Sequence, residues 1–237
     1  MEKEPARAPG KNREINDILM YKCLILDHDD TAVDSTASVH YPAHLEVMKK
    51  LRPGEPVITL DTWFEKNFHP GIMVYLTEEI GLSDKEMEEE FHIWQDFNSK
   101  HNPPFYAGLP ELMEEFIHRG GIIAVASHST EEHIRRHYQM GAPGITPEFI
   151  FGWDHNPEKR KPSPWPVFRI LEETNLNPED ILVVDDLKPG VQMARAAGVS
   201  VAAAGWGHSI PSIRKAMSEL CDVWLPDIEA LRNQLFG

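Results

Sequence analysis

Two carboxylates, Asp27 and Asp29, stand two positions apart in the string DHDDT, directly after the apolar run YKCLIL at residues 21–26. A short apolar run followed at once by polar residues is typical of a buried strand that ends in a loop. Because successive side chains of an extended chain alternate, this spacing directs both carboxylates to one side of the strand end. Open α/β sheets bind ligands at that end. An isolated pair of this kind also occurs in ordinary turns, so its meaning depends on what else reaches the same edge.

A serine follows a second buried run, IIAVA at residues 122–126. The Ser127 hydroxyl and the backbone amides after it could hold an oxyanion, although a lone serine at a strand end is more often a turn residue. Ser129 and Glu132 have the spacing of a capping box. This spacing predicts that a helix begins here with its N-terminus facing the same crevice.

Lys161 precedes Pro162 and Pro164 in the string EKRKPSPWPVF. The prolines bar a helix from starting before them and would hold the lysine in a fixed loop. Most lysines are solvated surface charges, so this one gains meaning only from the other groups that reach the sheet edge.

A second acidic pair, Asp185 and Asp186, ends the run ILVV at residues 181–184. Two like charges delivered to one strand end require a cation, and Mg²⁺ is the natural candidate for carboxylate oxygens. The string DHDDTAVDST resembles the start of a calcium-binding EF-hand loop. It lacks the glycine at the sixth position and the glutamate at the twelfth, where Ser38 stands, and this excludes that motif.

Short apolar runs alternate with helical patterns along most of the chain, which predicts a parallel sheet covered by helices on both faces. The runs that predict strands lie at residues 21–26, 122–126, 148–151, 181–184 and 199–203. The patterns that predict helices lie at residues 109–118, 131–140, 164–173 and 189–197. Residues 34–101 break this rhythm: they read as several helices without a convincing buried strand, and therefore as an insert. Residues 1–19 are charged and contain proline and glycine, which predicts a loose leader.

In their order along the chain, these motifs resemble those of the haloacid dehalogenase-like superfamily of phosphohydrolases. Its pattern is an apolar strand and DxDxT, a strand-end Ser or Thr, a Lys-Pro loop, and a strand-end acidic pair. DHDDT, Ser127, KPSP and VVDDLKPG match that pattern in sequence order, and the resemblance extends from about residue 21 to the C-terminus. The resemblance implies an α/β fold with a Rossmann-like core at residues 20–33 and 102–237 and an all-helical cap at residues 34–101. Within the superfamily the sequence is similar to the helical-cap subgroup of phosphoglycolate phosphatases and β-phosphoglucomutases.

The resemblance also implies a reaction through an aspartyl phosphate. Asp27 would be the nucleophile, and Asp29 would protonate the leaving alcohol and then deprotonate the attacking water. Thr31 would brace the loop beside the phosphate. Ser127 and Lys161 would hold the phosphoryl oxygens.

The implied cofactor is Mg²⁺, held by Asp27, the backbone carbonyl of Asp29, Asp186, and Asp185 either directly or through water. His128 follows Ser127 and would touch the substrate with its backbone amide or its ring.

Two residues depart from the superfamily pattern. Asp30 stands where glycine is usual, and aspartate tolerates the positive φ of such a turn. We expect its side chain to point to solvent; an inward carboxylate would raise the pKa of Asp29 and tighten metal binding. Ala32 replaces a common leucine, which predicts a smaller packing contact at the start of the insert.

Polar and aromatic residues of the insert are candidates for choosing the substrate, although an aromatic stripe at helical spacing is more often core. These candidates are His40, Tyr41, His44, Trp63, Lys66 and His69.

The amino-acid composition limits the kinds of partner that this protein can bind. The 237 residues are 41% apolar and 26% charged, with a net charge of -15, which is the wrong sign for binding a nucleic-acid backbone. Two cysteines outside any CxxC spacing favour a reducing cytoplasm over a disulfide or zinc scaffold. No apolar run approaches the ~20 residues that span a bilayer. The expected partner is a small phosphorylated metabolite; the sequence does not indicate an oligomeric state.

Several alternatives remain open at this stage. A sugar-phosphate mutase would use the same aspartates, and phosphoglycolate, sugar phosphates and nucleoside monophosphates all fit the residues. A phospho-accepting receiver module also uses an acidic pair and a Lys-Pro, but needs about a hundred residues after the pair, where this chain has about fifty. Dehalogenation and phosphonate cleavage are disfavoured because the resemblance implies that those branches lack an aspartate at the position of Asp29.

Overall fold

The computed structural model describes residues 19–237, which form one parallel sheet of six strands in the order β3-β2-β1-β4-β5-β6. The strands are β1 (Cys23–Leu26), β2 (Ile122–Ala126), β3 (Phe149–Phe151), β4 (Ile181–Asp185), β5 (Ser200–Ala204) and β6 (Val223–Leu225). β1 lies between β2 and β4 near the middle of the sheet. The expected parallel α/β core is therefore confirmed.

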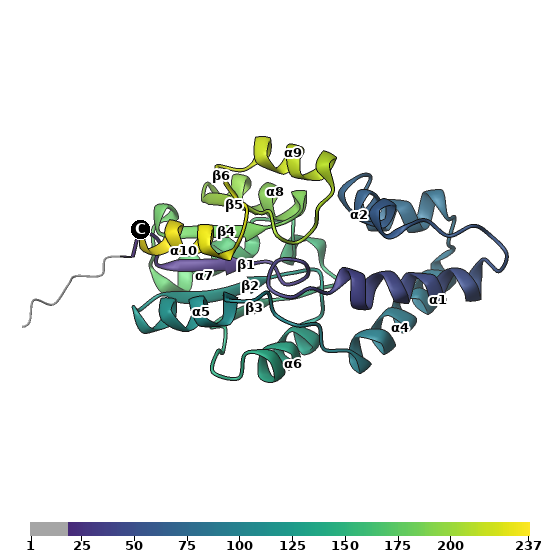
Figure 1. Cartoon of the computed structure of the whole chain (residues 1–237), viewed down its shortest axis with the longest axis horizontal. Coiled ribbons are helices and arrows are strands. Elements are labelled where there is room, and N and C mark those ends of the chain that lie inside the picture. Colours follow the sequence, from purple (N-terminus) through teal and green to yellow (C-terminus); the bar gives the residue numbers. More distant parts are fainter. Residues whose placement is uncertain (1–18) are drawn as a thin grey trace, which may run out of the picture.

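The alternation of side chains along β1 explains why this strand is apolar throughout. Leu24 and Leu26 pack on one face of the sheet, and Cys23 and Ile25 pack on the other; all four are fully buried. The first face is covered by α5 (Leu109–His118), α6 (Glu131–Gly141) and α10 (Ile228–Phe236). The second is covered by α7 (Trp165–Thr174), α8 (Lys188–Ala197) and α9 (Pro211–Leu220). The core therefore has three layers, as the sequence predicts (Figure 1).

All five predicted strands and all four predicted helices are present. Their observed boundaries differ from the predicted ones by no more than two residues. The sequence did not predict β6, α9 or α10. β6 is a three-residue strand at the sheet edge, and its apolar run VWL is shorter than the four to eight residues that predict a buried strand. The predicted leader lies outside the described residues except for Leu19, which packs against the core.

Residues 36–100, called the helical insert below, contain no strand and form a layer of their own beyond one end of the sheet (Figure 1). The insert consists of η1 (Thr36–His40), α1 (Tyr41–Leu51), α2 (Leu60–Phe68), α3 (Ile72–Val74), η2 (Tyr75–Glu79) and α4 (Asp84–Lys100). It has its own apolar cluster around Val47, Trp63, Tyr75, Leu76 and Leu82. η1 follows β1 by only a short loop, so the insert lies at the carboxyl ends of the strands.

The two linkers of the insert are bonded to each other. Val33 pairs with Phe105 in an antiparallel bridge. The Asp34 N–H donates to the Pro104 carbonyl over 2.9 Å, and the Tyr106 N–H donates to the Ala32 carbonyl over 3.1 Å. Both linkers therefore leave the core side by side.

Side chains also join the insert to the core on two sides. The Arg136 guanidinium of α6 donates to the carbonyl oxygens of Ser99 at 2.8 Å and His101 at 2.9 Å, at the end of α4. On the other side, the Lys188 ammonium lies 4.0 Å from the centre of the Phe68 ring of α2. These contacts hold the insert over the strand ends. Among the helices of residues 19–237, none combines the length and the apolar character needed to cross a bilayer.

Candidate active site

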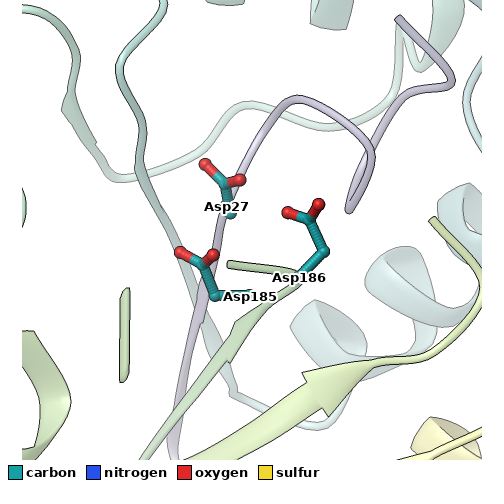
Figure 2. A group of neighbouring side chains, drawn as sticks. All are labelled: Asp27, Asp185 and Asp186. Atoms are coloured by element: carbon teal, nitrogen blue, oxygen red, sulfur yellow. The ribbon is translucent and has the colours of Figure 1, made fainter. Parts of the chain in front are cut away.

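Three carboxylates from two adjacent strands meet at the carboxyl end of the sheet. Asp27 follows β1, Asp185 ends β4 and Asp186 comes next, and all three side chains are buried. Each offers an oxygen that lies within 4.8 Å of the others (Figure 2). The strand register causes this meeting, because Leu26 pairs with Val184 and the Asp27 N–H donates to the Val184 carbonyl over 2.9 Å. The predicted convergence of the two acidic motifs is present.

Lys161 supplies the positive charge of this cluster. Its ammonium donates to Asp27 Oδ1 over 2.7 Å and to Asp185 Oδ2 over 2.6 Å, and the side chain is buried. Burial opposes its charge, but the two carboxylates outweigh burial and raise the pKa of Lys161. An ammonium has three hydrogens, so one remains for a further acceptor such as a phosphoryl oxygen.

One lysine does not balance three carboxylates. Burial, and then the neighbouring carboxylate of Asp27, raise the pKa of Asp185 to about 7 and the pKa of Asp186 well above its usual range. A divalent cation bound among them would favour their ionised forms, and carboxylate oxygens are ligands that Mg²⁺ accepts. The acidic cluster is thus chemically suited to Mg²⁺.

The hydrogen bonds indicate which of these oxygens a cation could use. Asp185 is occupied at both oxygens, since Oδ1 accepts the Leu187 N–H over 2.8 Å and Oδ2 accepts Lys161. From the part of the chain that the structure describes, the Asp186 side chain accepts only the Thr31 hydroxyl, at Oδ1 over 3.3 Å. Among the described residues no donor reaches Oδ2 of Asp27 or of Asp186. These two oxygens are the free ligands.

Asp29 lies two residues after Asp27, but its carboxylate accepts hydrogen bonds from residues outside the acidic cluster. Oδ1 accepts the Ser35 hydroxyl over 2.8 Å and the His40 Nε2–H over 2.9 Å, and Oδ2 accepts the Ser129 hydroxyl over 2.6 Å. Burial acts to raise the pKa of Asp29, but His40 and these hydrogen bonds hold it well below its usual range. Asp29 is therefore a well-oriented carboxylate, and only its backbone carbonyl remains for the predicted role in metal binding.

The helix after Ser127 begins one residue later than the capping-box spacing predicts. Thr130 is the N-cap of α6 and its hydroxyl accepts the His133 N–H, so the assignment of Ser129 as the cap was wrong. Ser129 lies one residue too early to cap the helix, and its hydroxyl donates to Asp29 instead. Ser127 is buried and its oxygen accepts the Ser129 N–H over 3.0 Å.

His128 bonds to the loop that carries the lysine. Its Nε2 lies 2.9 Å from the Lys161 carbonyl oxygen, so the ring supports this loop. Contact of His128 or Ser127 with a substrate stays a prediction.

The expectation that Asp30 points to solvent was wrong. Its side chain is buried and accepts the Thr36 N–H over 3.1 Å, so it holds the first turn of the insert. Its φ of 55° is left-handed, as expected at a glycine position. Burial raises the pKa of Asp30 to about 7, whereas the pKa of Asp29 is lowered, against the expected effect of an inward carboxylate. A Cβ at Gly207 would lie 2.1 Å from the Asp30 carbonyl oxygen, so this turn requires glycine opposite it.

Thr31 and Ala32 are both fully buried in this loop. The Thr31 hydroxyl bonds to Asp186 and its carbonyl accepts the Trp206 indole N–H over 2.9 Å, which matches the predicted bracing role. Its contact with phosphate stays a prediction.

Of the six candidates in the insert, His40 reaches the site. The Tyr41 hydroxyl donates to the Ile58 carbonyl, His44 stacks on Trp63 inside the insert, Lys66 pairs with Glu79, and His69 is exposed. Sequence reasoning missed Ser35 and Trp94, whose indole N–H donates to His40. Ser35 could have been noticed beside the DHDDT string, but Trp94 carries no such signal.

A family model described as haloacid dehalogenase-like hydrolase matches residues 24–204, more than half of the chain. This chain belongs to that family. The phosphoglycolate phosphatase of Aquifex aeolicus is 28% identical over 194 residues, which cover 79% of this chain and 86% of that protein. Phosphoglycolate phosphatase 1 of Pseudomonas aeruginosa is 23% identical over 208 residues, or 85% of this chain and 76% of that protein.

Solved structures show the same fold. A putative phosphoglycolate phosphatase from Lactobacillus delbrueckii superposes with a TM-score of 0.73 at 19% identity, covering 92% of this chain and 99% of that one. A CbbY variant from Rhodobacter sphaeroides, in complex with xylulose-(1,5)bisphosphate, gives a TM-score of 0.64 at 18% identity, covering 88% and 95%. The predicted haloacid dehalogenase-like membership, the Rossmann-like α/β fold and the class of activity, phosphoric monoester hydrolysis of a small metabolite, are confirmed.

One glycine of this haloacid dehalogenase-like site gives a first test. A Cβ at Gly190 in α8 would lie 2.0 Å from Asp185 Oδ2, the oxygen that accepts Lys161. Gly190→Ala is therefore expected to displace that carboxylate and lower kcat/KM about 100-fold, because small displacements of catalytic groups have large effects. Steady-state kinetics measure this. Gly144→Ala is the control, since a Cβ added there would have no atom of the described residues within 4 Å apart from its chain neighbours. Equal activity of the two variants would contradict the close approach at Gly190.

Proposed function

We propose that this protein is a Mg²⁺-dependent phosphatase that works through an aspartyl phosphate on Asp27. The observation that carries the proposal is the geometry of Asp27: Lys161 fixes Oδ1 at 2.7 Å, and Oδ2 stays free of described donors at the acidic cluster. Lys161 therefore holds the carboxylate in one orientation, in which one oxygen can bind a cation while the other attacks phosphorus.

Mg²⁺ would be held by Asp27, Asp186 and the backbone carbonyl of Asp29, with Asp185 contributing through water because both its oxygens accept hydrogen bonds. When bound, the ion supplies positive charge that screens the attacking carboxylate from the phosphate.

The proposed reaction has two displacements at phosphorus. In the first, an Asp27 oxygen bonds to phosphorus as the bond to the leaving oxygen breaks, and Asp29 gives that oxygen a proton. In the second, the Asp29 carboxylate takes a proton from water, the water oxygen bonds to phosphorus, and the Asp27–phosphorus bond breaks. The hydrogen bonds to Asp29 support the second role directly, since they hold it as a carboxylate.

The third hydrogen of Lys161 and the Ser127 hydroxyl would bind the phosphoryl oxygens. Thr31 and the amide of His128 would lie along the same edge. We also propose that residues 34–101 act as the cap of a core formed by residues 20–33 and 102–237, and that the cap selects the substrate and excludes water.

For the substrate we propose a small phosphorylated acid or sugar, with 2-phosphoglycolate as the first to test. The support is that curated relatives from five bacteria carry the name phosphoglycolate phosphatase. The sugar-phosphate mutase alternative shares the same aspartates. A cytoplasmic location stays a proposal supported by two unpaired cysteines.

The test is a panel of phosphorylated metabolites assayed for phosphate release with Mg²⁺ and with EDTA, using Asp27→Asn as the blank. We expect repeated turnover with Mg²⁺, and almost none with EDTA or the variant. Release of a rearranged phosphoester without free phosphate would show a mutase. Release of one equivalent only would show a receiver-like module, and release unaffected by EDTA would contradict the proposed metal.

The raised pKa values give a second prediction, on the stability of the protein. Because the folded pKa of Asp185 is about 7 and that of Asp186 is also raised, the metal-free folded state binds more protons than the unfolded chain between the usual carboxyl range and about pH 7. Their contribution to stability is therefore lost as pH rises through about 7, and Mg²⁺ binding becomes more favourable over the same window. The increase in Tm on adding Mg²⁺ should be larger at about pH 8 than at about pH 5.5.

The control for this measurement is Asp186→Asn, which removes a proposed ligand and should remove most of the Mg²⁺-induced increase. An increase that is equal at both pH values would contradict the proposed carboxylate ligands.

A further inference from the structure

We propose that Glu90, a carboxyl group on the inward face of α4, receives a hydrogen-bond donor of the leaving group of the substrate, either a hydroxyl or an ammonium. This inference rests on the proposed phosphatase activity and deepens it by naming a class of substrate. It favours phosphorylated compounds whose leaving group carries such a donor, and it disfavours those whose leaving group carries a carboxylate.

Glu90 stands in the middle of the face of α4 that is turned away from solvent. Met87, Trp94 and Asn98 lie on this face with it, at spacings of three, four and eight residues, and all three side chains are partly or fully buried. The opposite face carries the exposed side chains Lys85, Glu88, His92 and Asp96. A carboxyl group on an inward face costs free energy unless a partner compensates it.

The other half-buried carboxyl groups of α4 have such partners. Glu86 pairs with Arg52 at 2.6 Å, and Glu89 pairs with Lys50 at 2.5 Å. Within residues 19–237, by contrast, no group donates a hydrogen bond to Glu90. Burial raises the pKa of Glu90 to about 7, whereas the hydrogen bond from Arg52 lowers the pKa of Glu86 to about 2. Glu90 therefore keeps a hydrogen-bonding capacity that its neighbours on the helix have used.

The inward face of α4 lies against the residues that surround Asp29. The Trp94 indole donates to His40 Nδ1 over 2.9 Å, and His40 Nε2 lies 2.9 Å from Asp29 Oδ1. The Trp94 ring also meets the edge of His133 in α6 of the core, with centroids 5.5 Å apart. Glu90 lies one helical turn before Trp94, and His40 acts to lower its pKa, against the effect of burial. Glu90 therefore extends from the insert toward the region in which Asp29 would protonate the leaving group.

The chemistry of this carboxyl group decides which leaving groups it accepts. Ionised Glu90 can only accept hydrogen bonds, and a hydroxyl or an ammonium can donate one. The bond from an ammonium would be the stronger, because both partners are charged. A carboxylate on the leaving group would instead bring two like charges together in a half-buried place, which is unfavourable.

A series of two-carbon phosphates that differ only in the terminal group tests this inference. The series consists of ethyl phosphate, 2-hydroxyethyl phosphate, 2-aminoethyl phosphate and 2-phosphoglycolate, which end in a methyl, a hydroxyl, an ammonium and a carboxylate. Steady-state kinetics with Mg²⁺ at about pH 8, where most of Glu90 is ionised, give kcat/KM for each compound. For the wild-type protein we expect the highest values for the hydroxyl and ammonium compounds and the lowest for 2-phosphoglycolate.

Two substitutions separate the charge of Glu90 from its capacity to accept a hydrogen bond. Glu90→Gln removes the charge, so kcat/KM should fall about 30-fold on 2-aminoethyl phosphate and rise about 10-fold on 2-phosphoglycolate. Glu90→Leu also removes the acceptor, so kcat/KM on 2-hydroxyethyl phosphate should fall about 10-fold. Ethyl phosphate should change by less than about 3-fold in both variants. Damage to the fold of the insert would not change two substrates in opposite directions.

The matched control is Glu88→Gln, which makes the same change at an exposed position of the same helix. It should change kcat/KM on all four compounds by less than about 2-fold. Thermal unfolding shows whether each variant is folded, and neither Glu90 variant should have a lower Tm, because each loses a carboxyl group without a partner. Calorimetric titration of the Asp27→Asn protein, with and without the Glu90 substitutions, measures the binding of the same four compounds without turnover.

The outcomes separate this inference from the proposed function. Equal changes on all four compounds in the Glu90 variants, no change, or a wild-type preference for 2-phosphoglycolate would overturn the role of Glu90. A loss of 2-phosphoglycolate turnover in Glu90→Leu but not in Glu90→Gln would overturn it too, since Glu90 would then bind the acid as a protonated donor. Failure of the proposed function would appear instead as an Asp27→Asn protein that still hydrolyses ethyl phosphate.

Discussion

Asp27→Asn is expected to lower phosphate release by at least about 10⁴-fold, the largest effect of any single change in this protein. The amide cannot attack phosphorus as a carboxylate does, and it also removes one negative charge from the acidic cluster. Asparagine has nearly the shape of aspartate, so the backbone hydrogen bond from the N–H of residue 27 to the Val184 carbonyl is kept. The variant should therefore keep the fold. Initial rates with Mg²⁺ measure the loss. Mass spectrometry of the quenched wild-type enzyme should show one added phosphoryl group that the variant lacks.

The control is Asp34→Asn, an exposed carboxylate of the same loop region, which should keep the wild-type rate. If Asp27→Asn kept more than a few per cent of the activity, another residue would have to be the nucleophile, and the two-step reaction would be wrong.

Lys161→Ala is expected to lower kcat/KM about 10³-fold and to destabilise the metal-free protein. Within residues 19–237, the substitution removes the only ammonium bonded to Asp27 and Asp185 and leaves two buried carboxylates without this counter-charge. Breaking a buried ion pair in this way costs about 3–5 kcal/mol. Mg²⁺ should restore part of the stability, because it brings positive charge to the same carboxylates, but it should not restore the activity. Kinetics and urea denaturation with and without Mg²⁺ measure both effects.

Lys159→Ala is the matched control, since this lysine lies two residues earlier in the same loop and its ammonium stands over the Trp165 ring at 5.9 Å on the exposed side. It should leave both quantities nearly unchanged. A Lys161→Ala variant with normal stability in EDTA would mean that the carboxylates are already protonated without the lysine.

Much of the fold and of the acidic cluster follows from local pattern. A parallel sheet gathers the carboxyl ends of its strands at one edge, so any polar residue that ends an apolar run is placed there by topology alone. This is why the sequence alone could predict that Asp27, Asp185 and Asp186 lie close together. The lysine needed the family pattern in addition, because nothing local in its loop points the side chain inward.

The rest depends on packing between distant segments. His40 and Trp94 stand 54 residues apart, and no period relates them, so their contact exists only through the packing of η1 against α4. Asp30 was misjudged because the aspartate of a turn usually faces water, whereas here the Thr36 N–H at the start of the insert satisfies it. The cap assignment of Ser129 failed by one residue, within the usual uncertainty of a helix end.

The bonded linkers of the insert have a consequence for the diversification of such enzymes. Since Val33 and Phe105 are paired, the chain leaves the core and returns to it at nearly the same point. The order of the six strands therefore does not depend on the structure of the insert. An unrelated module of suitable length could replace the insert there without changing the registers that align Asp27 with Asp185 and Asp186. A laboratory graft that replaces the segment between residues 34 and 104 would use the same pair of bonded linkers.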